Sequence, residues 1–217
     1  MRLSSFTRVP AIAATLILSS LLVACGQTSA QASKTATEEM PANTAVAVFA
    51  GGCFWCTESD FDKVPGVVAT TSGYIGGTVD NPSYQQVSAG GTGHVEAVQV
   101  RYDTSKTSYA KLLEAYWPTI DPITVNSQFC DHGSQYRSAI FYANAEEQAL
   151  AEASKAALQT SGRFKQDIAT EILPMTTFYP AEEYHQNYYQ RNPVRYTYYR
   201  SGCGRDARLE QLWGKKH

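Results

Sequence analysis

The chain passes from a strand into a helix at Gly51-Gly52-Cys53-Phe54-Trp55-Cys56-Thr57-Glu58. The apolar run at 45–50 before it is typical of a buried strand, and the segment from 53 to about 63 can form a helix. Two glycines at the junction permit a sharp turn and leave space beside the backbone. Cys53 therefore falls near a helix N-terminus, where amide groups and the helix dipole favour a thiolate. We expect the pKa of Cys53 to be lowered.

A second cysteine, Cys56, follows one helical turn later, within reach of a disulfide to Cys53. A bridge that closes so short a loop constrains the unfolded chain little, so a purely structural disulfide is disfavoured here. The pair instead predicts a nucleophile with its own resolving thiol.

Other functions for the cysteine pair are possible from the residues alone. A zinc site would need two more ligands, from Cys130, Cys203 or a histidine, and the sequence has no second C-x-x-C and no H-x-x-x-H pattern. A thioredoxin-like disulfide carrier would explain the pair but not the polar loops described below. A binding module without turnover is a third alternative.

Composition and charge limit the partners of the chain. Its 217 residues are 43% hydrophobic and 18% charged, which is typical of a globular protein with one core. The net charge of −2 and the lack of a long basic run indicate no nucleic-acid partner.

The N-terminus has the pattern of an export signal. Arg2 and Arg8 precede an apolar run at 11–23, which ends in Leu-Val-Ala-Cys at 22–25. This ending resembles a bacterial lipobox and implies cleavage before Cys25 and lipidation of that residue. The alternative is an ordinary secretory signal with a chance cysteine.

The leader predicts three parts of the chain: a lipoprotein signal peptide at 1–24, a lipidated polar tether at 25–44 and a folded domain at 45–217. We expect an exported protein held by lipid on the periplasmic side of a bacterial membrane. Gly26 in place of an aspartate favours the outer membrane in a Gram-negative host.

The folded domain alternates short strands with helices. Apolar alternation predicts strands at 45–50, 67–74, 94–102, 138–142 and 168–173, and helical spacing predicts helices at 53–63, 109–117 and 145–160. This order predicts an α/β fold, an α+β plait with a ferredoxin-like split β-α-β core.

The remaining segments of the domain lack clear periodicity. Two polar loops at 78–93 and 121–137 are long enough to suggest function. The aromatic-rich segment at 176–200 and a short amphipathic piece at 208–213 are expected to form a C-terminal tail that wraps the domain.

Five motifs together resemble the peptide methionine sulfoxide reductase A family. They are GGCFWC at 51–56, GYIGG at 73–77, NPSY at 81–84, GHVEAV at 93–98 and QYRS at 135–138, in the family's order. The resemblance implies reduction of methionine-S-sulfoxide, free and in proteins, as a repair of oxidised proteins. It also implies no metal and no other cofactor, a thioredoxin-like reductant and a monomer.

The resemblance implies a role for each motif. It makes Cys53 the nucleophile and Glu96 the acid, with Phe54 and Trp55 around the substrate methyl group, and supporting polar groups from Tyr84, Tyr136 and Asp131. The residues around Glu96 support its role as the acid, because burial among apolar strand neighbours would raise its pKa and keep it protonated. The alternatives are a solvent-facing glutamate, core aromatics and loop-packing tyrosines.

The resolving cysteine departs from the commonest family pattern. Many members have glycine at the position of Cys56 and asparagine at that of Cys130, and keep their resolving cysteines near the C-terminus. We favour Cys56 because of its spacing, with Cys203 as the alternative resolver or a second shuttle. A structural disulfide between Cys130 and Cys203 is equally compatible with export.

Overall fold

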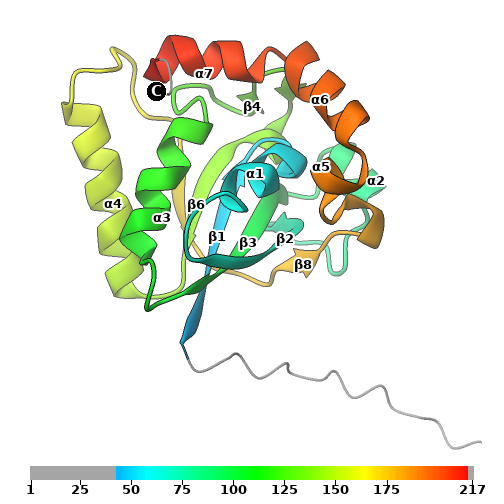
Figure 1. The fold of residues 1–217 in the computed structure, drawn as a ribbon, viewed down its shortest axis with the longest axis horizontal. Coiled ribbons are helices and arrows are strands. Elements are labelled where there is room, and N and C mark those ends of the chain that lie inside the picture. The colour runs from blue at the N-terminus through cyan, green and yellow to red at the C-terminus, as the bar shows by residue number, and fades with distance from the viewer. Residues whose placement is uncertain (1–42, 215–217) are drawn as a thin grey trace, which may run out of the picture. The chain divides into compact units, whose positions relative to one another are not determined.

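A six-stranded sheet forms the centre of the computed structural model, which describes residues 43–214 (Figure 1). Its strand order is β7-β6-β1-β3-β2-β8. The strands are β1 (Thr44–Gly51), β2 (Val67–Ile75), β3 (Val95–Asp103), β6 (Ser138–Tyr142), β7 (Glu171–Pro174) and β8 (Tyr179–Pro180). A separate two-stranded hairpin is formed by β4 (Ser127–Gln128) and β5 (Asp131–His132). The expected mixture of sheet and helices is confirmed.

The sheet pairing brings the segment that contains Cys53 and the strand that contains Glu96 to the same end of the sheet. Strand β3 is antiparallel to both β1 and β2, so it lies between two strands that share a direction. Phe49 near the end of β1 pairs with Val98, and Tyr74 near the end of β2 pairs with Glu96. The end of β1, which leads to Cys53, therefore lies beside the start of β3, which carries Glu96.

Helices connect the strands and form most of the C-terminal part of the described chain. They are α1 (Phe54–Phe61), α2 (Tyr84–Ser88), α3 (Tyr109–Tyr116), α4 (Ala145–Thr160), α5 (Tyr188–Arg191), α6 (Pro193–Gly202) and α7 (Arg205–Trp213), with short 3-10 turns at Trp117–Thr119, Ser134–Tyr136 and Glu183–His185. The expected caps are present, since the side chains of Ser108 and Asn144 accept amide hydrogen bonds at the starts of α3 and α4. Within 43–214, none of these helices has the length and apolarity required to span a bilayer.

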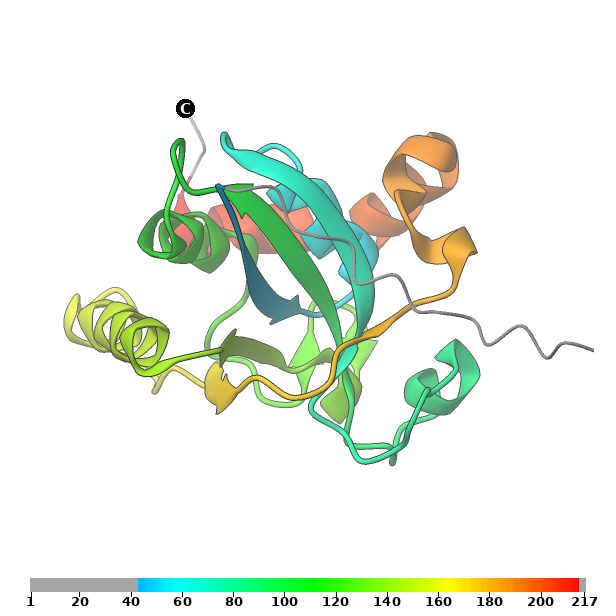
Figure 2. The same cartoon turned by 90° about the horizontal axis from the view of Figure 1, so that it is seen from below.

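The two faces of the sheet are covered differently. On one face, Phe49 stacks against Phe61 of α1 at 4.9 Å and Tyr116 of α3 at 5.1 Å between ring centroids. On the other face, the extended segment between β7 and β8 crosses the strands (Figure 2), and its Met175 and Phe178 pack on a smaller apolar cluster. The packing of α1 and α3 on this face thus holds the start of α1 against a rigid core.

The structure corrects several sequence expectations. The loop at 78–93 contains α2, and the loop at 121–137 contains the β4–β5 hairpin. The tail contains α5 and α6, and the last helix begins at 205 instead of 208. These helices carry few apolar residues at regular spacing and depend on contacts to the domain, which a sequence pattern does not reveal. The predicted signal peptide at 1–24 and most of the tether, including Cys25, lie outside the described residues.

Candidate active site

The start of α1 presents two free thiols in the interior. Cys53 is 7% exposed and Cys56 is 1% exposed, and neither forms a disulfide. Cys53 is the N-cap residue, and its carbonyl oxygen accepts hydrogen bonds from the amides of Cys56 at 3.1 Å and Thr57 at 3.3 Å. The turn requires glycine at Gly52, because its φ is +82° and an added Cβ would lie 2.5 Å from Gln128.

The two thiols are electrostatically unequal. Burial raises the pKa of Cys53, and its hydrogen bond to Cys56 and the nearby carboxyl groups of Glu96 and Asp131 raise it further. The same hydrogen bond lowers the pKa of Cys56 to about 7, with support from the charge of Arg205. The expectation of a lowered Cys53 pKa was therefore wrong for the free protein, because burial outweighs the helix terminus.

Glu96 is the buried acid beside the helix start. Its side chain is 2% exposed, and its Oε2 accepts a hydrogen bond from the amide of Phe54 at 3.0 Å. Burial raises its pKa to about 8, against the lowering effect of that hydrogen bond, and the charge of Asp131 raises it further. The expected burial is confirmed, and Glu96 carries a proton at neutral pH.

Tyr84 and Tyr136 reach the same region from two different loops. Tyr84 is the first residue of α2, which a Ser83 capping box begins, and its amide donates to Glu182 at 2.8 Å. Burial, followed by the charges of Glu96 and Cys53, raises the pKa of Tyr84 to about 12. Burial and Glu96 likewise raise the pKa of Tyr136. Both hydroxyls are therefore protonated donors beside the acid and the thiol.

Asp131 meets a residue that the sequence had not singled out. The Tyr199 hydroxyl of α6 donates a hydrogen bond to Asp131 Oδ2 at 2.6 Å. Burial raises the pKa of Asp131, while this hydrogen bond opposes the rise. Burial and the charges of Cys53 and Asp131 raise the pKa of Tyr199, which also hydrogen-bonds with the Cys53 thiol. Only its position in an aromatic-rich segment could have pointed to Tyr199.

The two aromatics after Cys53 have different surroundings. Phe54 is 1% exposed, and its ring contacts those of Tyr74 and Tyr84 in the core. Trp55 is partly buried, stacks on Tyr188 at 3.8 Å between ring centroids, and packs edge-on against Tyr199. Trp55 is thus a partly exposed ring close in sequence to Cys53, whereas Phe54 belongs to the buried core. Their roles around a methyl group stay predictions.

His185 is a further buried neighbour of these aromatics, and we assign it no catalytic role from the sequence. It is 2% exposed, its Nδ1 accepts a hydrogen bond from Trp55 Nε1 at 3.0 Å, and its ring lies 5.0 Å from that of Phe54. Burial lowers its pKa, so it is neutral and holds the indole in place.

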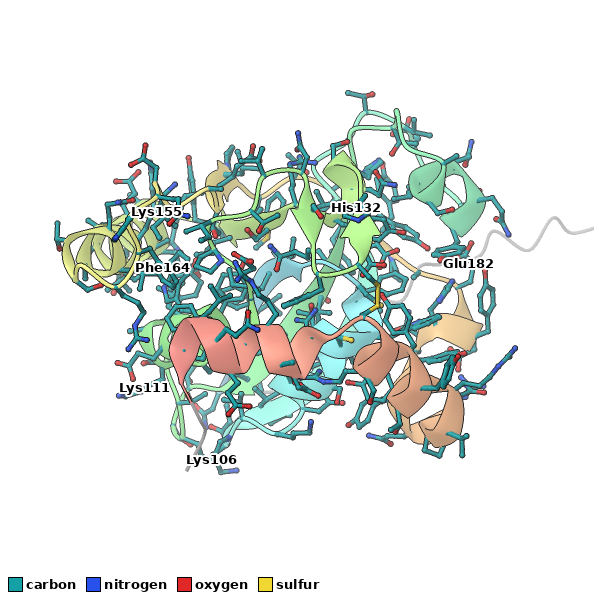
Figure 3. All side chains as sticks on the ribbon, turned by 90° about the horizontal axis from the view of Figure 1, so that it is seen from above. Lys106, Lys111, His132, Lys155, Phe164 and Glu182 are labelled. Carbon is teal, nitrogen blue, oxygen red and sulfur yellow. A yellow bond between two sulfur atoms is a disulfide. The ribbon has the colours of Figure 1, made fainter. Side chains whose placement is uncertain are left out.

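The other two cysteines form a disulfide. Cys130 and Cys203 are bridged with a Cα–Cα distance of 4.9 Å across 73 residues of sequence. The bridge joins the 121–137 loop to the end of α6, and Figure 3 shows it as a yellow bond beside the α6–α7 junction. Sulfurs of both cysteines and a carboxylate oxygen of Asp131 lie within 4.8 Å, but the disulfide occupies the two thiols. The structure therefore has Cys56, and not Cys203, as a free thiol next to Cys53.

Arg205, the first residue of α7, connects this helix to the turn that precedes Cys53. It is 1% exposed and donates to the carbonyl oxygens of Gly51 at 3.2 Å and Thr119 at 2.7 Å. Its guanidinium lies 4.4 Å from the ring centroid of Phe129. A buried cation of this kind fixes the backbone just before Cys53 and favours the anionic form of Cys56.

Comparison with known proteins gives one consistent family. The model of the family described as "Peptide methionine sulfoxide reductase" matches residues 45–217. The chain is 54% identical over 169 residues to the peptide methionine sulfoxide reductase MsrA of Halalkalibacterium halodurans, covering 78% of this chain and 96% of that protein. It is 49% identical to the Bacillus subtilis MsrA over 171 residues, covering 79% and 97%.

Solved structures agree in fold and in sequence. The reduced form of Mxr1 from Saccharomyces cerevisiae is 34% identical with a TM-score of 0.67, covering 71% of this chain and 89% of that chain. Methionine sulfoxide reductase A of Corynebacterium diphtheriae is 33% identical with a TM-score of 0.63, covering 71% and 77%. With its family model matched from 45 to the end, this chain belongs to the peptide methionine sulfoxide reductase family.

Proposed function

We propose that this chain reduces methionine-S-sulfoxide, free and in proteins, with Cys53 as the nucleophile and Glu96 as the acid. One observation carries the proposal: a buried thiol, paired with a second free thiol, lies beside a buried carboxyl group that is protonated at neutral pH. A sulfoxide oxygen leaves only when it is protonated, so the nucleophile and the acid must occur together.

The first step transfers oxygen from the substrate to Cys53. Glu96 donates its proton to the sulfoxide oxygen while the hydroxyls of Tyr84 and Tyr136 hold that oxygen by hydrogen bonds. The Cys53 sulfur gives up its proton and attacks the substrate sulfur, the oxygen passes to the Cys53 sulfur as the sulfur–oxygen bond of the substrate breaks, and methionine leaves. Cys53 becomes a sulfenic acid, and its released proton restores Glu96.

The second step resolves the sulfenic acid. The Cys56 sulfur attacks the Cys53 sulfur, water leaves, and a Cys53–Cys56 disulfide forms. Cys56 suits this step because it is hydrogen-bonded to Cys53 and its pKa of about 7 gives a large thiolate fraction at neutral pH. Cys203 remains the alternative resolver, reached only after its bridge to Cys130 is opened.

A dithiol protein returns the disulfide to two thiols by exchange. We expect thioredoxin or a thioredoxin-like protein in this role, with no metal or other cofactor. Yeast Mxr1, a solved relative, has also been crystallised in complex with Trx2.

The activity is tested with racemic methionine sulfoxide and dithiothreitol. We expect consumption to stop at about half of the racemate, with only the S-epimer lost, because one pocket fits one epimer. No consumption would contradict the reductase. Reduction of insulin disulfides in its place would indicate a thiol–disulfide carrier, and binding of oxidised peptides without turnover would indicate a binding module.

We further propose that the protein is exported and anchored through lipid at Cys25, on the periplasmic side of a bacterial membrane. The lipobox-like ending at 22–25 and the polar segment that follows it support this proposal. The Cys25→Ala variant should then appear in the soluble fraction of fractionated cells, whereas the unchanged chain sediments with membranes. Continued sedimentation of the variant would contradict lipidation.

A further inference from the structure

A groove beside the candidate active site shares Trp55 and Tyr199 with it, but the rest of the groove has no part in the chemistry described above. It has a volume of about 580 Å³ and lies between the start of α1 and helices α5 and α6. Its lining residues are Trp55, Tyr188, Val194, Arg195, Tyr198 and Tyr199. Five of these six are apolar or aromatic, so the groove suits apolar groups with one cation at its wall.

The groove is continuous with the side chains that surround the thiol. Trp55 is two residues from Cys53, and its ring contacts both Tyr188 and Tyr199 of the groove. Tyr199 reaches from the groove to Asp131 and to the Cys53 thiol. A methionine side chain that reaches Cys53 past Trp55 therefore leaves its own backbone next to the groove.

The outer wall of the groove is unusually exposed. Val194 is 81% exposed and Tyr198 is 83% exposed, and they are the two most exposed of the large hydrophobic side chains within 43–214. Arg195 has no hydrogen bond or ion pair to another described residue, although Arg191 nearby is paired with Glu183. An apolar wall with an unpaired cation at the edge of a site indicates contact with a further part of the ligand.

We propose that this groove binds the polypeptide on one side of a methionine sulfoxide and favours apolar and acidic residues there. The proposal rests on the proposed function and deepens it, because it names the sequence context of the protein-bound substrate. Burial of Val194 and Tyr198 under neighbouring apolar side chains supplies binding energy, and Arg195 pairs with an acidic neighbour. Free methionine sulfoxide has no neighbouring residues to contact the outer wall at Val194 and Tyr198.

The test compares three substrates in steady-state kinetics of the full chain. They are free methionine-S-sulfoxide, a hexapeptide with leucine and aspartate beside the oxidised methionine, and a hexapeptide with glycine and serine there. Tyr198→Ser should raise KM for the leucine–aspartate peptide by roughly five- to tenfold, the effect of burying one aromatic side chain. Its kcat and KM for the free substrate should not change.

Arg195→Gln isolates the charge. It should raise KM for the leucine–aspartate peptide by roughly two- to threefold at low salt, and the difference should vanish at high salt. The glycine–serine peptide should show wild-type KM with this variant.

Val68→Thr is the matched control. Val68 is also an exposed apolar residue, 51% exposed, but it lies at the start of β2, at the opposite end of the strand from Tyr74. Val68→Thr should leave kcat and KM unchanged for all three substrates. Unchanged peptide kinetics in Tyr198→Ser, or an equal loss on peptide and free substrate, would overturn the proposal. Failure of the unmodified chain on the free substrate would instead overturn the proposed function.

Discussion

The two cysteine pairs of the described chain differ in almost every physical respect. Cys53 and Cys56 are three residues apart, buried and reduced, and they share one helix start. Cys130 and Cys203 are 73 residues apart and oxidised, and they join a loop to the end of α6. A bridge in the first pair would constrain the unfolded chain little, whereas the second constrains it strongly. The first pair therefore suits chemistry and the second suits stability.

The largest expected effect comes from the nucleophile itself. Cys53→Ser replaces a thiol with a hydroxyl that neither ionises near neutral pH nor accepts oxygen from a sulfoxide. Methionine release should disappear, even in a single turnover without reductant, as measured by chromatography of the quenched reaction. The double variant Cys130→Ser/Cys203→Ser is the control and should release about one methionine per enzyme. If this double variant is as inactive as Cys53→Ser, the second pair also takes part in the first step and the division of roles between the pairs is wrong.

Cys56→Ser should stop the cycle after its first step. The sulfenic acid still forms, so about one methionine per enzyme is released, but the turnover with thioredoxin stalls because no nearby thiol resolves it. Mapping the thiols of the unchanged enzyme after one turnover should show a Cys53–Cys56 bridge. Normal cycling of Cys56→Ser, or a mapped bridge from Cys53 to Cys203, would make Cys203 the resolver.

Glu96→Gln should slow the first step by roughly 10²- to 10⁴-fold, the usual contribution of a general acid. The acid acts only while protonated, and its pKa is about 8, so the wild-type first step should decline as pH rises above about 8. Single-turnover rates between pH 6 and 10 measure both effects. The glutamine variant should lack this decline, and an unchanged rate would refute the role of Glu96 as the acid.

The same residue links stability to pH. Its pKa in the folded protein, about 8, lies above the ordinary value of 4.5, so the folded state binds more protons between these values. The free energy of unfolding should therefore fall as pH rises from about 4.5 to about 8 through this group. Denaturant titrations of Glu96→Gln should lose that part of the pH dependence.

The sequence predicted the features that depend on local spacing. Two glycines before Cys53 predicted the strand-to-helix turn, and the apolar alternation predicted the strand that carries Glu96. The alternation left open whether Glu96 faces solvent or the interior, where the structure places it. The pairing of Cys130 with Cys203 depends on long-range folding, so spacing left it open. The role of Tyr199 could not be predicted for the same reason, because only the packing of α6 over the 121–137 loop brings its hydroxyl to Asp131.

Opening the second disulfide should cost stability and not chemistry. The double variant Cys130→Ser/Cys203→Ser should lower the free energy of unfolding by about 2–4 kcal/mol, because a long loop of the unfolded chain is released. Thermal unfolding should show Tm lowered by roughly 5–15 °C for a domain of this size. Dithiothreitol should lower Tm of the unchanged chain similarly and leave the variant unaffected. Equal Tm values for the two chains would contradict a stabilising role.

The smallest expected effect concerns the residue that joins the two regions. Tyr199 contacts the Cys53 thiol on one side and Asp131, the neighbour of Cys130, on the other. Tyr199→Phe keeps the ring but removes the hydroxyl, and should lower the free energy of unfolding by about 1 kcal/mol, the usual net value of one hydrogen bond.

Tyr198→Phe is a matched control for this change, because the Tyr198 side chain is 83% exposed and has no hydrogen bond to a described residue. It should leave the unfolding free energy unchanged. Loss of the Tyr199 donor also removes an interaction that holds down the pKa of Asp131, so that pKa should rise in Tyr199→Phe but not in Tyr198→Phe. NMR titration of the Asp131 carboxyl measures this difference. If the two variants titrate alike, the hydroxyl of Tyr199 does not couple the disulfide region to the thiol pair.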